Sequence, residues 1–446
     1  MGSVAAALCD RGFAVTGSDE NVYPPMSTFL EKRGVAINEG FRAENIPEDA
    51  DVVVIGNAMK RGNPEVEAVL NRKLLYLSLP EVLKNNFLRG RHNLVVTGTH
   101  GKTTTTSLLA WIMEKAGCQP GFMIGGIPKN FGEGSRLNDS KYFVIEGDEY
   151  DTAFFDKRSK FVHYLPELVI VNNIEFDHAD IFRTLDDIKT SFRHLLRIVP
   201  QNGMILFNGD DPICVEVAKD CLAQLVEVGL SRNCAQRIRD VALSTDGSRF
   251  TLGNDVYEIP LVGEFNVRNA AMAITAARFY DVPKTKIDDA LKSFTGVARR
   301  LELRGEANGV KVIDDFGHHP TAISKTLHAL RNRYPGQRIW AIFEPRSNTT
   351  RRAVFQDELP EALKVADGVF IAQVAKLEQI PEKERLNPEA LVNTIAESGR
   401  PAFYEAGADA IVDRIVPMLK PNEIVAVFSN GGFDNIHEKL LERLKG

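Results

Sequence analysis

Hydrophobic and polar positions near the start of the chain alternate between strand-like and helix-like spacing. In chain order they predict a helix at 3–8, a strand at 13–16, a helix at 26–33, a strand at 52–55, a helix at 64–70 and a strand at 74–77. Strands that alternate with helices indicate a small parallel sheet with crossover helices. We therefore expect a Rossmann-like domain over residues 1–90, with a basic, non-periodic linker at 88–93.

The first predicted helix stands where a doubly wound domain normally has a strand and a glycine turn. The chain begins Met1-Gly2 and enters the helix at once, so that first strand is missing. We expect either a truncated first domain or an authentic start that lies upstream of Met1.

Short, strongly apolar runs dominate the middle of the chain. Four of them are each followed by a polar or glycine-containing turn: 94–96, 142–146, 168–172 and 203–207. Such runs are typical of parallel strands that are buried on both faces. Antiparallel strands are predicted within 241–259 and an alanine-rich helix at 266–280. We expect a central parallel sheet over residues 91–298.

A charged, extended stretch at 297–310 marks a further boundary, after which strands and helices alternate again. The later strands are predicted at 311–313, 339–343, 368–371 and 424–428. We expect a C-terminal Rossmann-like α/β domain over residues 299–446. Three domains also fit the length of 446 residues, because single domains usually hold ~150.

Composition excludes several classes of function. Hydrophobic residues make up 44% and charged residues 26%, which is typical of a globular protein. The net charge is −6 and no long basic run is present, so we expect no nucleic acid and no membrane as partner. Five scattered cysteines, no signal peptide and no apolar run of about 18 residues predict a cytoplasmic protein. We expect a monomer or a weak homo-oligomer.

The candidate chemistry begins at a loop between the strand at 94–96 and the helix at 104–115. The loop reads Gly98-Thr99-His100-Gly101-Lys102-Thr103. In such a loop, backbone N–H groups and a helix N-terminus face phosphate oxygens, the lysine reaches the outer phosphates and the threonine hydroxyl binds Mg²⁺. Standard spacing would place a glycine at the position of Val96, so the loop is a shortened variant. It predicts ATP binding and a central domain of the P-loop ATPase type.

Two further strand ends carry polar clusters. The strand at 142–146 continues as Glu146-Gly147-Asp148-Glu149-Tyr150-Asp151. Four acids so close together repel one another unless cations are near, so the cluster is either an Mg²⁺ site or a solvated acidic loop. The strand at 168–172 leads to His178, which is a ligand, a base or a surface residue. Parallel order brings the three strand ends to one edge, which can bind phosphates and two divalent ions.

The remaining polar motifs have a plain and a functional interpretation. Asn266 either caps the alanine-rich helix or holds adenine through its amide. Arg299-Arg300 stand at the second boundary, and Asp314 to Pro320 include the pair His318-His319. We do not expect a metal site made by that pair, because neighbouring side chains point apart in an extended chain.

Taken together, these motifs resemble those of the Mur ligases, the ATP-dependent amide ligases of peptidoglycan synthesis. The resemblance covers nearly the whole chain and is carried by 97–104, the Glu146 cluster, 173–178, 266–269, Arg299-Arg300 and 314–320. It implies ATP and Mg²⁺ as cofactors. Some family members have a carbamylated lysine about fifteen residues after the metal-binding histidine, but this chain has Arg193 there, so no carbamate is expected.

Within the family, five segments are more similar to ligases that add a tripeptide than to those that add L-alanine: 56–64, 153–164, 301–306, 344–349 and 429–433. The resemblance implies an enzyme that joins recycled L-alanyl-γ-D-glutamyl-meso-diaminopimelate to the lactyl carboxylate of UDP-N-acetylmuramate through an acyl phosphate. Two alternatives stay open: the same chemistry with free L-alanine, and an inactive homologue that only binds nucleotide. A nicotinamide dehydrogenase is not supported, because residues 1–87 contain no G-x-G-x-x-G motif.

The resemblance also implies roles for individual residues. We expect catalysis by Lys102, Glu146 and His178, and metal binding by Thr103, Glu146 and His178. ATP is expected to contact Gly98, Thr99, His100, Gly101, Lys102, Thr103, Thr104, Asn266, Asn269, Arg300 and Asp315. Substrates are expected to contact Ser18, Asp19, Asn57, His318, Arg346, Ser347 and Asn348. The first three of these would meet the uridine diphosphate group, and the last three would meet the peptide.

Overall fold

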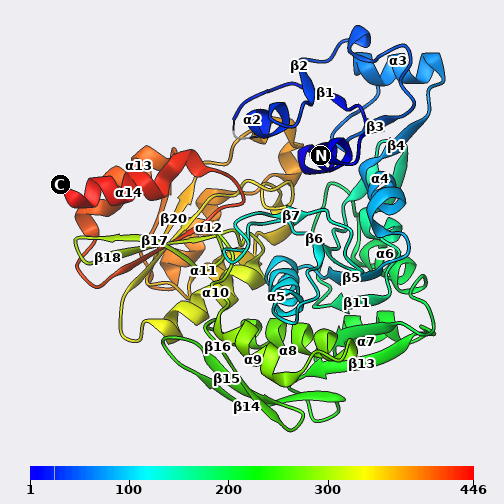
Figure 1. Cartoon of the computed structure of the whole chain (residues 1–446). Helices are drawn as coiled ribbons and strands as arrows, with labels where there is room; N and C mark the ends of the chain where they lie inside the picture. Colours follow the sequence, from blue (N-terminus) through cyan, green and yellow to red (C-terminus); the bar gives the residue numbers. More distant parts are fainter. Residues whose placement is uncertain (25) are drawn as a thin grey trace.

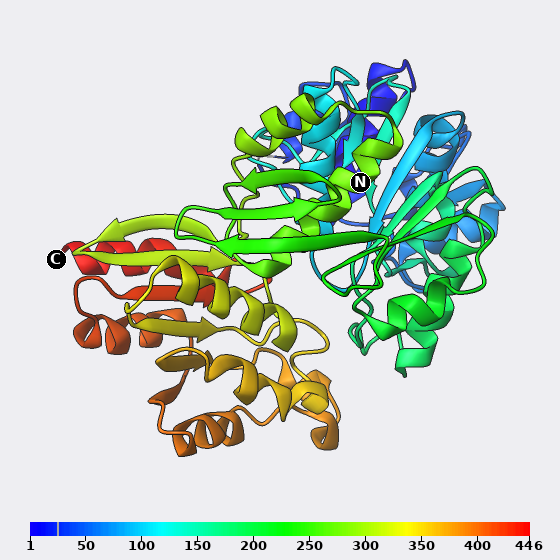
Figure 2. The same cartoon turned by 90° about the horizontal axis from the view of Figure 1, so that it is seen from below.

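Five sheets organise the computed structural model, which describes residues 1–24 and 26–446. One sheet has ten strands, one has six, and three have two strands each. Figures 1 and 2 show the chain passing from the N-terminal region (blue) through the large central sheet to the C-terminal sheet (yellow to red). Parallel pairing dominates and helices alternate with strands, which confirms the predicted α/β class.

The N-terminal region contains two separate strand pairs. Its elements are α1 Gly2–Asp10, β1 Thr16–Asp19, α2 Met26–Glu31, β2 Ala36–Glu39, β3 Val53–Ile55, α3 Pro64–Arg72, β4 Tyr76–Ser78 and α4 Leu79–Leu83. β1 pairs with β2 and β3 with β4, both in parallel; among the described strands no ladder joins the two pairs. The predicted strand at 13–16 is displaced to β1, because the apolar run that suggested it is not buried and Phe13 is 53% exposed.

The N-terminal region is attached to the central sheet through α4. A capping box starts this helix: Ser78 Oγ accepts the N–H of Glu81, whose carboxylate accepts the N–H of Ser78. The chain continues helically through Lys84–Leu88, and Phe87 packs in the core beneath the central sheet. The predicted linker at 88–93 is therefore wrong in extent, since only residues 89–91 separate the helix from the next strand.

The central sheet has the strand order β16-β15-β14-β13-β12-β11-β5-β8-β6-β7. Its strands are β5 His92–Thr97, β6 Gly121–Met123, β7 Ser135–Arg136, β8 Tyr142–Glu146, β11 Leu168–Val171, β12 Met204–Asn208, β13 Gln224–Gly229, β14 Gln236–Leu243, β15 Ser248–Leu252 and β16 Asp255–Ile259. A hairpin of β9 Asp151–Ala153 and β10 Asp156–Ser159 follows β8. Pairing is parallel from β14 to β6 and antiparallel at both ends, so the predicted antiparallel strands are confirmed.

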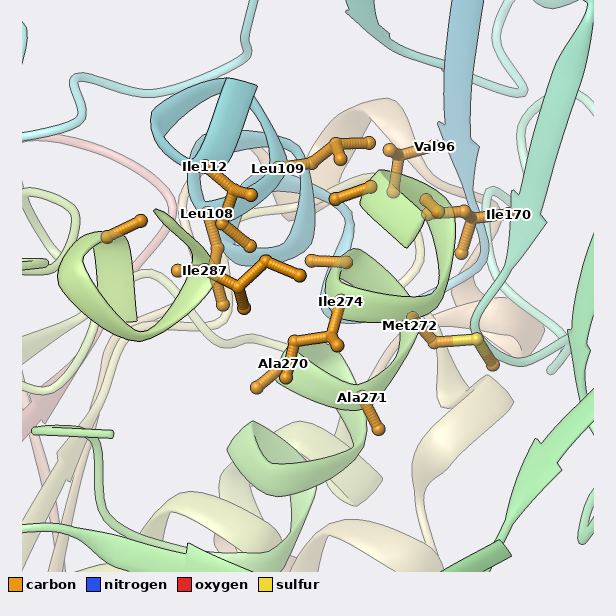
Figure 3. Close-up of a cluster of buried hydrophobic side chains, with 14 of the residues drawn as sticks. Val96, Leu108, Leu109, Ile112, Ile170, Ala270, Ala271, Met272, Ile274 and Ile287 are labelled. Carbon is orange, nitrogen blue, oxygen red and sulfur yellow. The ribbon is translucent and has the colours of Figure 1, made fainter. Parts of the chain in front are cut away.

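Helices cover both faces of the central sheet. On one face lie α5 Lys102–Lys115, α8 Glu264–Phe279 and α9 Lys284–Lys292. Figure 3 shows Leu108 of α5, Ile274 of α8 and Ile287 of α9 in one buried hydrophobic cluster. The alanines of α8, such as Ala270, are buried and small, which lets this helix lie close to its neighbours. On the other face of the sheet lie α4, α6 Leu185–Leu196 and α7 Pro212–Ala218.

The C-terminal sheet has the order β17-β18-β22-β19-β20-β21, with β17 antiparallel at its edge. Its strands are β17 Glu302–Ala307, β18 Val310–Asp315, β19 Ile339–Phe343, β20 Gly368–Ala372, β21 Ala402–Glu405 and β22 Ile424–Phe428. The helices are α10 Pro320–Arg333, α11 Glu358–Leu363, α12 Pro388–Glu397, α13 Ala408–Ile415 and α14 Ile436–Lys445. The first three cover one face and the last two the other. In the described part of the chain, no helix has both the length and the apolar character needed to cross a membrane.

Candidate active site

Three neighbouring strands of the central sheet end side by side at one edge. β5 pairs with β8, where Val96 lies opposite Glu146, and with β11, where Thr97 lies opposite Val171. The loops after these strands open into a cleft of about 1150 Å³, which the C-terminal segment 315–319 also lines. Pockets for one small ligand usually measure ~300–1,000 Å³, so the cleft has room for more than one.

Two glycines give the loop after β5 a backbone shape that other residues rarely adopt. Gly98 has a φ of 128° and Gly101 a φ of 79°. A Cβ at Gly101 would lie 2.5 Å from Asn269 Oδ1, so a side chain does not fit there. α5 begins directly after Gly101, which has no side chain to cap the first N–H groups of the helix. This geometry suits phosphate oxygens.

Lys102, the first residue of α5, is held by an acid that the sequence pattern did not single out. Its Nζ donates to Gly98 O at 2.7 Å and to the Glu149 carboxylate at 2.9 and 3.0 Å. His178 Nε2 lies 3.0 Å from Glu149 Oε1. Burial acts to raise the pKa of Glu149, but Lys102 and His178 outweigh it and bring that pKa to about 2. Glu149 therefore carries a negative charge that positions both neighbours.

Thr103 and Glu146 form the second polar group of the cleft. Thr103 Oγ1 donates to Glu146 Oε1 at 3.0 Å, and Glu146 Oε2 accepts the N–H of Gly125 at 2.7 Å. Burial raises the pKa of Glu146, although Lys102 opposes the shift. Adjacent ligands at ~2.0–2.1 Å from Mg²⁺ lie about 3 Å apart, which is the spacing of these two oxygens. The pair fits Mg²⁺, which would also favour the charged form of the carboxylate.

His178 was expected to hold a second divalent ion beside this pair, and that stays a prediction. Among the described residues its Nε2 pairs with Glu149 rather than with Glu146 or Thr103. Burial acts to lower the pKa of His178, but Glu149 raises it overall. The backbone of His178 has a φ of 55°, a strained conformation for a residue with a side chain.

The chain enters the C-terminal region beside Thr103. Arg300 Nη2 donates to Thr103 Oγ1 at 3.2 Å. Asp315, at the end of β18, accepts the N–H groups of Leu301 and Gly317, both at 2.8 Å. Burial raises the pKa of Asp315, with Arg300 acting against it. These contacts place Arg300 against the glycine loop at 98–103, and the expected contact of Arg300 and Asp315 with ATP stays a prediction.

Asn266 and Asn269 lie beneath the same loop on α8. Both side chains are buried, at 5% and 6% exposure. Asn266 Nδ2 donates to Val262 O at 2.9 Å, and Asn269 Nδ2 donates to Asn266 Oδ1 at 3.2 Å. Asn266 is not the cap of α8, because Gly263 holds that position, so the capping interpretation is wrong. The contact of these amides with adenine stays a prediction.

The segment 346–350 lies beside His178. The N–H of Ala179 donates to Thr349 Oγ1 at 3.2 Å, which ties the segment to the third strand end. The Arg346 side chain is 53% exposed. The segment therefore stands next to the reaction site with one guanidinium open to solvent, and its contact with substrate stays a prediction.

The other expected substrate residues divide into two groups. His318 lines the cleft, with its Nε2 3.6 Å from Asp177 Oδ2. Ser18 Oγ accepts from Asn45 at 3.3 Å, and Asn57 donates to Asp151 O at 3.4 Å. Neither Ser18, Asp19 nor Asn57 belongs to the described cleft lining, to which the N-terminal region contributes Leu79, Pro80 and Leu83.

Glu149 is the residue that the sequence interpretation left out. It belongs to the acidic cluster, but only Glu146 was selected because it ends the strand. Glu149 is only 3% exposed, so its charge needs a charged partner. The need of the loop lysine for a buried acid opposite it is the signal that would have identified Glu149. Arg193, at the place of the carbamylated lysine, pairs with Glu216 on the surface of α6 and α7.

Comparison with family models assigns all three parts of the chain. Residues 1–90 match the Mur ligase family, catalytic domain. Residues 96–277 match the Mur ligase middle domain, and residues 299–431 match the Mur ligase, glutamate ligase domain.

Individual relatives are similar over the whole length. The chain is 47% identical to the UDP-N-acetylmuramate--L-alanyl-gamma-D-glutamyl-meso-2,6-diaminoheptandioate ligase of Escherichia coli (strain K12), with 100% of the chain and 96% of the relative covered. It is 33% identical to the UDP-N-acetylmuramate--L-alanine ligase of Acetivibrio thermocellus, with 99% and 93% covered. A crystal structure of a murein peptide ligase from Psychrobacter arcticus 273-4 has a TM-score of 0.73 and 37% identity, with 100% and 96% covered. The predicted three-domain α/β fold is thereby confirmed.

Proposed function

Since the chain belongs to the Mur ligase family and is an ATP-dependent ligase that forms amide bonds, we propose that it joins UDP-N-acetylmuramate to L-alanyl-γ-D-glutamyl-meso-diaminopimelate. The bond would form between the lactyl carboxylate of the sugar and the L-alanine amine of the tripeptide. The higher identity to the Escherichia coli ligase than to the L-alanine ligase supports the tripeptide as acceptor. Because the acceptor is already a peptide, the reaction would reuse fragments of existing peptidoglycan.

The observation that carries the proposal is the meeting of three strand ends in one cleft. Three separate segments supply Lys102 with Thr103, Glu146 with Glu149, and His178. Glu149 joins Lys102 to His178 through hydrogen bonds, and Thr103 joins Glu146 to Arg300. A cationic loop beside a metal-type oxygen pair is suited to ATP. The size of the cleft leaves room beside the nucleotide for part of a further reactant.

The chemistry requires activation because a carboxylate anion is a poor electrophile. A lactyl carboxylate oxygen attacks the γ-phosphorus of ATP, the bond from that phosphorus to the β,γ-bridging oxygen breaks, and ADP leaves. The acyl phosphate then accepts the amine at its carbonyl carbon. Inorganic phosphate leaves with the bonding electrons, and the nitrogen loses a proton to form the amide.

Residues of this chain stabilise the charge that moves in the first step. Burial acts to lower the pKa of Lys102, but Glu149 and the nearby acids raise it, so Lys102 stays charged at the phosphates. Arg300 and the N-terminus of α5 add positive charge on the same side. Mg²⁺ held by Thr103 and Glu146 would neutralise phosphate oxygens, and His178 is the proposed ligand of a second ion.

Other residues would bind and orient the two substrates. The tripeptide carries carboxylates, which suit the forked guanidinium of Arg346, and Ser347 and Asn348 adjoin it. Ser18, Asp19 and Asn57 are proposed for the uridine diphosphate group at the N-terminal strand pairs. Arg300, which donates to Thr103 Oγ1, and Asp315 would contact ATP when the domains close, and that closure would keep water from the acyl phosphate.

A side-by-side assay tests the proposal. The purified protein is given UDP-N-acetylmuramate, ATP and Mg²⁺ with either the tripeptide or L-alanine at equal concentration, and ADP release and product mass are measured. We expect a kcat/KM for the tripeptide at least ~100-fold above that for L-alanine, since a site with groups for peptide carboxylates loses them with the small acceptor. Equal or better use of L-alanine would contradict the tripeptide assignment.

The same experiment separates the inactive homologue. If neither acceptor gives ADP, titration calorimetry of ATP and of UDP-N-acetylmuramate decides between the alternatives. Binding of ATP without binding of the UDP-sugar would show a nucleotide-binding protein without ligase activity.

A further inference from the structure

A second polar cluster bridges the central and C-terminal sheets. It contains His100 of the nucleotide loop, Glu175 from the segment after β11, and His319 at the start of α10. One ligand atom of each residue lies within 4.8 Å of the others, and the two imidazole ring centres are 4.4 Å apart. Glu175 and His319 have no part in the proposed reaction.

Two of the three distances between ligand atoms in this cluster match those of a metal centre. Glu175 Oε2 lies 3.4 Å from His100 Nε2 and 3.5 Å from His319 Nδ1. Tetrahedral ligands at ~2.0–2.2 Å from Zn²⁺ lie about 3.4 Å from one another. Two imidazoles and one carboxylate form a known zinc ligand set, which leaves a fourth position open. All three residues line the cleft, so an ion has a path of entry.

The hydrogen bonds of His319 orient its ring so that Nδ1, and not Nε2, faces the cluster. Its Nε2 lies 3.2 Å from Phe176 O, which assigns the ring proton to Nε2. The lone pair of Nδ1 then faces Glu175 and accepts only a long hydrogen bond, 3.2 Å, from the N–H of Thr321. This lone pair and Glu175 Oε2 are 3.5 Å apart and repel each other. The Thr321 hydroxyl donates to the same oxygen at 2.6 Å, and a cation between the two atoms would turn the repulsion into attraction. In a metal-bound imidazole, the nitrogen that does not bind the metal usually donates to a carboxylate, a backbone carbonyl or water, as His319 Nε2 does to Phe176 O.

His100 supplies an independent observation. Its Nε2 is buried and has no hydrogen-bond partner within residues 1–24 and 26–446, although Glu175 is near. Burial lowers the pKa of His100, and burial with the help of His100 lowers the pKa of His319 to about 4. Among the surrounding charges, Asp177 favours a cation and Lys325 opposes one.

We infer that His100, Glu175 and His319 form a binding site for one Zn²⁺-type ion, separate from the Mg²⁺ site at Thr103 and Glu146. Mg²⁺ is a poor occupant, because it prefers oxygen ligands in octahedral geometry. Two ligands come from the central region and one from the C-terminal region. The ion therefore joins the two regions at the nucleotide loop. This inference does not depend on the acceptor that the ligase uses.

Equilibrium dialysis with Zn²⁺ alone as the probe tests the site, with excess Mg²⁺ and ADP present to fill the nucleotide cleft. We expect one Zn²⁺ per wild-type chain. His319→Asn and Glu175→Gln should each weaken that binding by at least about tenfold, the effect of losing one ligand or its support. Asparagine at 319 keeps an acceptor for the N–H of Thr321, so α10 retains its cap. His328→Asn, at an exposed position of the same helix, is the matched control and should bind as wild type.

Two further measurements keep the result interpretable. If Zn²⁺ bound at the reaction site instead of at this cluster, His178→Gln would weaken its binding. We expect the zinc affinity of His178→Gln to equal that of the wild type. Zn²⁺ should raise the unfolding midpoint of the wild type and of His328→Asn, but not that of His319→Asn, because a ligand stabilises only the protein that binds it. Unchanged zinc affinity in both ligand variants, or a loss only in His178→Gln, would overturn the inference.

Discussion

The reaction cleft and the N-terminal region hold their polar residues in different ways. In the cleft, Lys102, Glu149 and His178 form one hydrogen-bonded chain between buried strand ends. In the N-terminal region, Ser18 and Asn57 stand at two short strand pairs over small apolar clusters. Within residues 1–24 and 26–446, the side chain of each makes one long hydrogen bond, of 3.3 or 3.4 Å.

The difference fits the roles proposed for the two regions, which are phosphoryl transfer in the cleft and binding of the sugar nucleotide in the N-terminal region. Phosphoryl transfer needs charges that are already in place, because reorganisation during the reaction is costly. Binding of a sugar nucleotide tolerates small adjustments. Removing a buried charge also leaves its partners unpaired, whereas removing an exposed amide does not. We therefore expect substitutions in the cleft to change the kinetic constants more than substitutions in the N-terminal region.

The largest effect is expected for Lys102→Ala. The variant loses the charge expected to neutralise the phosphates and removes one of the two charged partners of Glu149, so tripeptide-dependent ADP release should fall by at least ~10²–10³-fold. Lys115→Ala, at the exposed end of the same helix, is the control. Turnover like that of the wild type in Lys102→Ala would contradict the ATP assignment.

Glu149→Gln should have the next largest effect. It removes the acid that positions Lys102 and His178, and we expect kcat to fall by about 10–100-fold with folding retained. The pKa of His178 should also fall, because its negative partner is gone. Steady-state kinetics and an NMR titration of the histidine check both. Asp151→Asn, whose partner is the exposed Lys157, is the control, and equal effects of the two would refute the special role of Glu149.

Arg346→Ala tests a case between the buried cleft and the exposed N-terminal region, because the Arg346 side chain is exposed but stands next to the reaction site. Loss of one charge-assisted contact, worth ~1.5–3 kcal/mol, should raise the KM for the tripeptide by about tenfold or more. The KM for ATP should change little. Arg443→Ala, on the exposed face of α14, should change neither constant. Equal increases for tripeptide and ATP would argue against contact with the peptide.

Asn57→Ala should have the smallest effect. One neutral hydrogen bond is worth ~0.5–1.5 kcal/mol, so the KM for UDP-N-acetylmuramate should rise by at most about tenfold while kcat stays unchanged. A large decrease in kcat would show that the N-terminal region takes part in fixing the reacting groups.

Most of the fold could be predicted because its signals are local. The runs Leu94–Val96 and Leu168–Val171 are apolar at every position, which only strands buried on both faces require. The prediction failed at 13–16, where the apolar residues remain at the surface. The linker at 88–93 was overestimated because burial of the helix before it depends on packing against the central sheet.

The candidate site was predictable only in part. The loop lysine and the strand-end acids have fixed places in the sequence, so they could be identified. The turn after β8 determines that Glu149 is the acid of the cluster that faces Lys102. The sequence pattern does not reveal the shape of this turn, so Glu149 could not be identified from it. The contact of His100 with His319 depends on how two regions dock, and no local signal encodes that.

The most direct test of the account follows an oxygen atom. UDP-N-acetylmuramate labelled with ¹⁸O in the lactyl carboxylate is turned over with ATP and the tripeptide, and the inorganic phosphate is analysed by mass spectrometry. The account predicts one ¹⁸O in each phosphate released, because the carboxylate oxygen attacks phosphorus and leaves with it. Unlabelled phosphate, with amide product formed, would contradict the acyl phosphate and the role assigned to the cleft.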